Sequence, residues 1–174
     1  IQAEGEQERM IARPATVPNP PAPFDMAEAT GGVSAGLARR HVARFFRSHD
    51  LATDRDLPGF RHSHATVGAL SLNHLTYGAE TTIGMPPLRD FYLLQWTLAG
   101  SATYRHDGTE DRAGVGDLTV VNPDRRYEKV WDDACTQLIL RVDRSLLDDT
   151  LAAWGTEGGR PIEPVIFTSG PVRE

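Results

Sequence analysis

Polar side chains that could contact a ligand recur at alternate positions of three apolar stretches of this sequence. They are Gln95 and Thr97 in FYLLQWTL, Tyr127 and Lys129 in YEKVW, and Gln137 and Arg141 in TQLILRV. Because successive side chains of a β-strand point to opposite faces, the polar groups of each stretch lie together on one face. A few amides, hydroxyls and cations among apolar side chains are typical of a cavity that orients a small molecule.

Histidines offer a second chemistry. His62 and His64 in RHSHA have the i, i+2 spacing that places two imidazoles on one strand face, and His74 follows one stretch later. Three histidines could bind zinc, but no further ligand completes such a site. Ser71 and Ser101 lie in no nucleophile-elbow context. We therefore predict no metal, no cofactor and no catalytic residue.

Bulk composition bounds the class of protein. The chain has 174 residues, of which 40% are hydrophobic and 24% charged, as expected for one globular domain. The formal net charge of −6 argues against direct contact with DNA phosphates. No apolar run reaches the roughly 18 residues of a membrane span, and the first residues do not resemble a secretory signal. Its one cysteine excludes an intramolecular disulfide and fits a reducing compartment. We expect a cytoplasmic protein that does not contact membranes.

The order of sequence patterns predicts a mainly β domain between two helices. Residues 1–34 include a proline-rich stretch and should form a flexible arm, and residues 35–174 should form the folded domain. An amphipathic helix is expected over residues 36–50, then a loop, and a second helix in DRSLLDDTLAAWG. Nine short β-rich stretches between residues 60 and 142, separated by turns, favour a sandwich or barrel.

Several motifs resemble a known family. Gly100, Gly108, the GVGDLTVVNP of residues 114–123 and Tyr127 resemble the two conserved halves of a cupin barrel, a jelly-roll or double-stranded β-helix. Read with ARRHVARFFRSHDL and LILRVDRSLLDDTLAAWG, the chain from about residue 35 to 168 is similar to the N-terminal ligand-binding domain of AraC-family transcription regulators, in particular the AraC-binding-like group. The family's DNA-binding region, two helix-turn-helix units, is expected further C-terminal and is absent from this chain.

The resemblance implies which side chains face the interior. Tyr127 stands where metal cupins have a histidine, and Leu93 where they have a glutamate, so a metal-free barrel is implied. The cupin register directs the polar faces inward, which predicts a ligand-binding set of Gln95, Thr97, Tyr127, Lys129, Gln137 and Arg141, with His74 as a further candidate. The alternate face of the last strand should pack beneath the second helix.

The two inward cations need partners, because an unpaired buried cation costs several kcal/mol. For Lys129 and Arg141 the partner could be a ligand carboxylate or a protein acid such as Glu128 or Asp132. Alternatively, Lys129 could extend its amine outward to solvent, and Arg141 could tie the barrel to the helix that follows.

The resemblance implies an effector-sensing domain that binds a small organic molecule in the barrel and contacts DNA only through the missing domain. A homodimer is compatible with this resemblance. The effector would bind two arrangements of the protein with different affinity. Its binding would thereby change the behaviour of the N-terminal arm or the dimer contacts, and so the way the DNA-binding domains are presented. One alternative is a metal-dependent cupin enzyme, an isomerase or dioxygenase using His62, His64 and His74. The other is a filled barrel that only dimerises.

Overall fold

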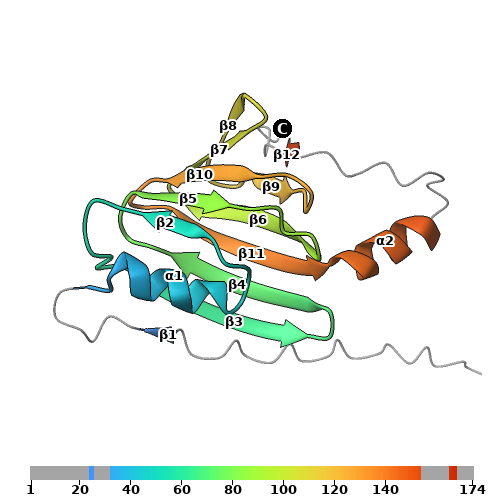
Figure 1. Cartoon of the computed structure of the whole chain (residues 1–174), viewed down its shortest axis with the longest axis horizontal. Helices are drawn as coiled ribbons and strands as arrows, with labels where there is room; N and C mark the ends of the chain where they lie inside the picture. Colours follow the sequence, from blue (N-terminus) through green and yellow to red (C-terminus); the bar gives the residue numbers. More distant parts are fainter. Residues whose placement is uncertain (1–23, 26–31, 154–164, 168–174) are drawn as a thin grey trace, which may run out of the picture.

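Two antiparallel sheets make up the fold in the computed structural model, which describes residues 24–25, 32–153 and 165–167. In the larger sheet the strand order is β1 (Phe24–Asp25), β3 (Arg61–Val67), β4 (Leu70–Thr76), β11 (Thr136–Asp143), β6 (Phe91–Ala99), β9 (Leu118–Val121) and β12 (Val165–Phe167). In the smaller sheet the order is β2 (Asp50–Ala52), β5 (Thr81–Met85), β10 (Tyr127–Trp131), β7 (Ala102–His106) and β8 (Thr109–Ala113). Figure 1 shows α1 beside β2, β4 and β3, and α2 at the far end of β11.

The predicted jelly-roll barrel is confirmed, and all nine β-rich stretches form strands, β3 to β11. The expected loop after the first helix is wrong at its start, because Asp50–Ala52 pairs with β5 as strand β2. Consecutive strands along the chain often belong to different sheets, so residues distant in sequence face each other across the interior. Gly100, at φ +63°, needs glycine because an added Cβ would meet the backbone of Cys135.

The interior register follows the alternation expected from the sequence. On β6, Leu93, Gln95 and Thr97 are buried, whereas Leu98 on the opposite face is exposed. Strand β10 alternates in the same way, with Lys129 buried on its inner face. Since β6 belongs to the larger sheet and β10 to the smaller one, their inner faces oppose each other across the barrel.

Helix α1 (Ala35–Ala43) is shorter than the predicted helix over residues 36–50. Ser34 caps its start, and its end tightens into a turn in which the amides of Arg44 and Phe45 donate to the carbonyls three residues earlier. The amphipathic pattern continues beyond this turn because Phe46 and His49 are also covered by the protein. These two residues lie after the end of the helix, in a bend and an irregular segment, so their burial does not come from a continuous helix face.

A chain of buried hydrogen bonds joins α1 to the larger sheet. Asn73 donates through its amide nitrogen to Ser71, so its Oδ1 accepts from His62 Nε2 at 3.1 Å. The other ring nitrogen of His62 then accepts from His41 Nε2 at 3.0 Å. Burial lowers the pKa of His62 to about 4 and also lowers the pKa of His41. Both rings are therefore neutral at pH 7.

Acid should weaken the domain through His62. The unfolded chain takes up this proton below the ordinary pKa of 6.5, whereas the folded chain resists until about pH 4, so the free energy of unfolding falls as the pH drops between these values. We expect a loss of roughly 2 to 3 kcal/mol between pH 7 and pH 4.5. Urea unfolding of the wild type and of His62→Gln at both pH values measures it. Equal losses in the two proteins would contradict the assignment to His62.

Helix α2 (Arg144–Ala153) confirms the second predicted helix. The alternate face of β11 was expected to pack beneath this helix, but α2 extends away from the end of the strand (Figure 1). Arg144 fixes its first turn by pairing with Asp124 at 2.7 Å, and no α2 side chain is buried. Nearly all of the predicted arm, and Trp154 onward apart from β12, lies outside the described residues. Within the described part, neither helix could cross a membrane.

Candidate ligand-binding site

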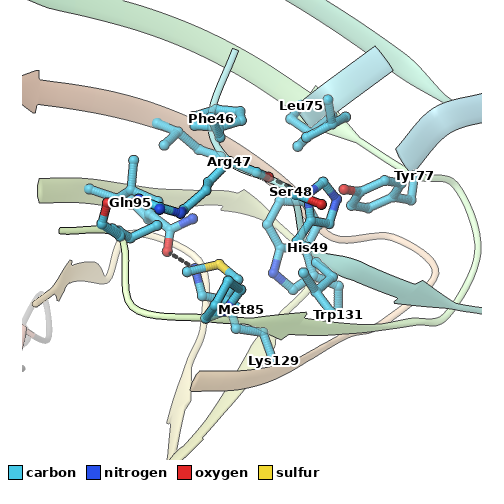
Figure 2. A pocket seen from close by; sticks show the side chains of 16 residues that line it. Phe46, Arg47, Ser48, His49, Leu75, Tyr77, Met85, Gln95, Lys129 and Trp131 are labelled. Atoms are coloured by element: carbon cyan, nitrogen blue, oxygen red, sulfur yellow. Dashed lines mark hydrogen bonds between the residues drawn. The ribbon is translucent and has the colours of Figure 1, made fainter. Parts of the chain in front are cut away.

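A cavity lies inside the barrel, between the inner faces of the two sheets and beneath residues 46–49, which we call the roof segment. The cavity has a volume of about 40 Å³. Most of its wall is apolar, and the polar or aromatic side chains that line it include Phe46, His49, Tyr77, Gln95, Lys129 and Trp131. Figure 2 shows these side chains converging from the roof and from both sheets.

Lys129 is the most unusual group in this wall. Its side chain is 1% exposed, and its amine donates to Gln95 Oε1 at 2.6 Å, across the barrel from β10 to β6 (Figure 2). The amine also lies 5.3 Å from the centre of the Tyr104 ring. Burial lowers the pKa of Lys129 from 10.5 to about 7. Within the described residues it forms no salt bridge.

Neither of the two acids considered from the sequence as partners of Lys129 pairs with it. Glu128 is on the opposite face of β10, where it is half exposed and pairs with Arg105 at 2.9 Å. Asp132 accepts from Ser101 at 2.8 Å. A neutral amide is thus the hydrogen-bond partner of a cation that water no longer solvates. The amine retains donor capacity for an anion.

Lys129 is also the only lysine of the chain, whose other 17 basic residues are arginines. An arginine stays charged in any protein environment, whereas a buried lysine can release its proton. A lysine at this position can therefore be neutral in the empty barrel and charged beside an anion.

Thr97 and Gln137 lie in the barrel interior but not in the wall of this cavity. Gln137 donates to Thr97 Oγ1 at 3.3 Å and to the hydroxyl of Tyr104 at 3.0 Å. These three side chains form a second polar link between the sheets. Of the predicted set, the structure thus brings only Gln95 and Lys129 to the cavity.

Tyr127, Arg141 and His74 lie elsewhere. The Tyr127 hydroxyl accepts from the amide of Asn122 at 3.2 Å, outside the cavity wall. Arg141 is 28% exposed and pairs with Asp143 of the same strand at 3.0 Å, so its partner is neither of the two acids considered from the sequence. His74 is half-buried on the outer face of β4, opposite to inward-facing Asn73.

The three histidines of the alternative metal site do not converge. His62 and His64 share a face of β3, with ring centres 6.0 Å apart. His74 pairs with Ser63 and therefore lies on the other face of the same sheet. Both ring nitrogens of His62 are occupied by protein partners. Among the described residues no cluster of three or more histidine, cysteine or acidic side chains could hold a metal.

His49 and Tyr77 were missed as cavity residues by sequence reasoning. His49 lay within the residues assigned to a helix, and Tyr77 comes directly after strand β4. A single lysine among 17 arginines was a usable signal for Lys129. No sequence pattern indicated that the roof segment closes the barrel, because that depends on where the preceding helix ends.

The chain is similar to a protein family, to several transcriptional activators and to a solved structure. A family model described as the AraC-binding-like domain matches residues 38–171. XylDLEGF operon transcriptional activator 3 of Pseudomonas putida is 29% identical over 107 residues, which cover 62% of this chain and 32% of the relative. XylDLEGF operon transcriptional activator 1 of the same species is 30% identical over 109 residues, 62% of this chain and 34% of that protein. The chain thus spans about a third of the length of these relatives.

The solved structure of the AraC-like transcriptional activator CuxR resembles the fold with a TM-score of 0.54 at 18% sequence identity. The match covers 66% of this chain and 44% of that one. It supports the fold and says nothing about individual site residues.

Proposed function

Because this chain belongs to the AraC-binding-like domain family, we propose that it is the effector-sensing part of a transcription regulator and binds a small organic molecule inside the barrel. The matched relatives are named as operon activators, which supports a regulatory role over the alternative of a metal-dependent cupin enzyme. In this proposal a separate domain outside this chain contacts the DNA. We also propose that the protein forms a homodimer and is located in the cytoplasm.

One observation carries the proposal: the buried amine of Lys129 has only a neutral hydrogen-bond acceptor and no acidic partner in the described part of the chain. An anionic ligand supplies the missing charge. The remaining wall is mostly apolar, with side chains such as Leu75, Ile83 and Ile139. The effector class that fits is a small molecule with one carboxylate and an apolar body.

Binding requires the roof segment to move. A volume of about 40 Å³ is far below the roughly 150 Å³ of a cavity that admits benzene. The segment is held partly by Arg47, which donates to the carbonyl of Leu88 at 2.8 Å and lies 3.7 Å from the carboxylate of Asp90. An effector that binds the open arrangement more tightly than the closed one would shift α1 and the chain that precedes it.

Thermal unfolding in the presence of probe ligands tests the proposal. The probes are hexanoate, benzoate and cyclohexanecarboxylate, each compared with its uncharged carboxamide. A carboxylate at 100 times its Kd should stabilise the domain by about 2.7 kcal/mol. The carboxamides should stabilise it much less, since they cannot pair with an ammonium group.

Three outcomes count against the proposal. If carboxamides and carboxylates stabilise equally, Lys129 is not an anion anchor. If no organic probe shifts the unfolding midpoint, the filled-barrel alternative is favoured. Stoichiometric metal in the purified protein, required for turnover of any probe, would favour the enzyme.

A further inference from the structure

A second polar subsite lies in the same cavity, and we propose that it binds a hydroxyl group of the effector. This inference rests on the proposed function and narrows the effector to a hydroxylated carboxylate. The subsite consists of the Nε2 atom of His49, in the roof segment, and the indole nitrogen of Trp131, on β10. Figure 2 labels both residues on the Tyr77 side of the cavity, away from Gln95.

The contacts of His49 fix its protonation. The ring is 7% exposed, and its Nδ1 lies 2.9 Å from the carbonyl oxygen of Arg47. A carbonyl oxygen only accepts hydrogen bonds, so Nδ1 carries the hydrogen. Burial lowers the pKa of His49, which keeps the ring neutral at pH 7. Nε2 is then a lone-pair acceptor, and it has no protein partner within the described residues.

Trp131 supplies the complementary group. Its side chain is 1% exposed and packs edge-on against Tyr77, with ring centres 5.4 Å apart. The indole nitrogen can only donate a hydrogen bond, and it too has no partner in the described part of the protein. A buried donor without an acceptor is unfavourable, so this position favours a ligand that accepts from it.

One unpartnered acceptor and one unpartnered donor on two residues that line the same cavity define the chemistry of the proposed group. A hydroxyl oxygen can both donate and accept, so a hydroxyl group is the simplest group able to donate to His49 Nε2 and accept from the Trp131 indole. A ketone or carboxylate cannot donate, and an ammonium group cannot accept. The carboxylate belongs with Lys129, whose positive charge also disfavours a second cation in this cavity. A hydroxyl separated from the carboxylate by an apolar body matches both subsites.

The protonation of His49 can be tested without any ligand. Long-range ¹H–¹⁵N NMR of the protein at pH 7 distinguishes the two neutral imidazole forms, and the His49 signals are assigned from the spectrum of His49→Phe. The expected result is hydrogen on Nδ1 and none on Nε2. Hydrogen on Nε2, or a charged ring, would overturn the inference because no acceptor would then face the cavity.

Ligand preference is the second test. Binding of hexanoate and benzoate is measured by calorimetry and compared with binding of their monohydroxylated derivatives. At least one derivative should bind about tenfold or more tightly than its parent, since a site built for a hydroxyl discriminates against a ligand lacking it. Trp131→Phe and His49→Phe should each bring that ratio close to one. Trp96→Phe, at a partly exposed position outside the cavity wall, should leave it unchanged.

The outcomes separate this inference from the proposed function. If the parent carboxylates bind and no hydroxylated derivative binds more tightly, the subsite holds at most a water molecule and the inference is wrong, while the proposed function stands. If hydroxylated ligands gain affinity equally in wild type and Trp131→Phe, the subsite is placed wrongly. If neither parents nor derivatives bind, the proposed function fails, and the inference fails with it.

Discussion

Replacing Lys129 with methionine should make the domain more stable at pH 7 and abolish its binding of carboxylates. The buried amine has a pKa of about 7 in the folded protein, against 10.5 for an ordinary lysine. At pH 7 this difference corresponds to roughly 4 kcal/mol of lost stability. Methionine has a similar volume and no charge, but it leaves Gln95 without its donor, which costs about 1 to 3 kcal/mol. The net expectation is a gain of roughly 1 to 3 kcal/mol.

Urea unfolding at pH 7 measures this gain, and calorimetry with hexanoate and benzoate measures the loss of binding. Gln137→Met is the matched control, because Gln137 is equally buried and links the two sheets but lies outside the cavity wall. The control should be destabilised, since Tyr104 and Thr97 lose a hydrogen bond, and it should still bind carboxylates. A clearly destabilised Lys129→Met that still binds them would contradict the role given to Lys129.

Affinity for a carboxylate should fall steeply above pH 7. The ligand pairs with the charged amine, and the empty barrel releases that proton with a pKa of about 7. Each pH unit above this value then lowers the fraction of charged Lys129, and with it the affinity, about tenfold. Between pH 7 and pH 9 the Kd should rise by up to roughly 50-fold, the limit reached when the pKa of the complex lies well above 9.

Calorimetry in buffers of different ionisation enthalpy gives a second readout of the same linkage. At pH 8, wild-type protein should take up close to one proton for each carboxylate bound, and Gln137→Met should behave in the same way. A Kd that stays constant from pH 7 to pH 9, with no proton uptake, would show that the amine is already charged in the empty barrel.

A destabilising lysine inside a barrel is easier to explain by ligand binding than by folding. Apolar side chains such as Ile83, which pairs with Lys129 on the neighbouring strand, already fill much of the interior. A further apolar residue would stabilise the domain more than an amine held by a single glutamine. Natural proteins retain such groups where function requires them.

The barrel could be predicted from the sequence because its strands are short, alternate in burial and are separated by turn residues. Alternation also placed Gln95 and Lys129 in the interior, once the cupin resemblance had fixed which face is inward. The end of α1 could not be predicted, since the apolar spacing continues through Phe46 although the backbone leaves the helix at Ala43.

Facing inward proved insufficient to identify the cavity wall. Thr97 and Gln137 have the same inward register as Gln95, yet they bond to each other in a separate buried cluster. Which inward side chains line open space depends on the packing between the sheets and on the roof segment, and neither leaves a pattern in the sequence. His49 illustrates the limit, because its role depends on a backbone contact with Arg47.

The most direct test of the account is the pKa of Lys129 with and without a ligand. Because the chain has one lysine, protein labelled with ¹³C at lysine Cε gives a single side-chain signal that can be followed from pH 5 to pH 11. We predict a midpoint of about 7 in the free protein and a shift to above 9 when hexanoate or benzoate is bound. A midpoint near 10.5 in both states would contradict a buried, unpaired amine that anchors an anionic effector.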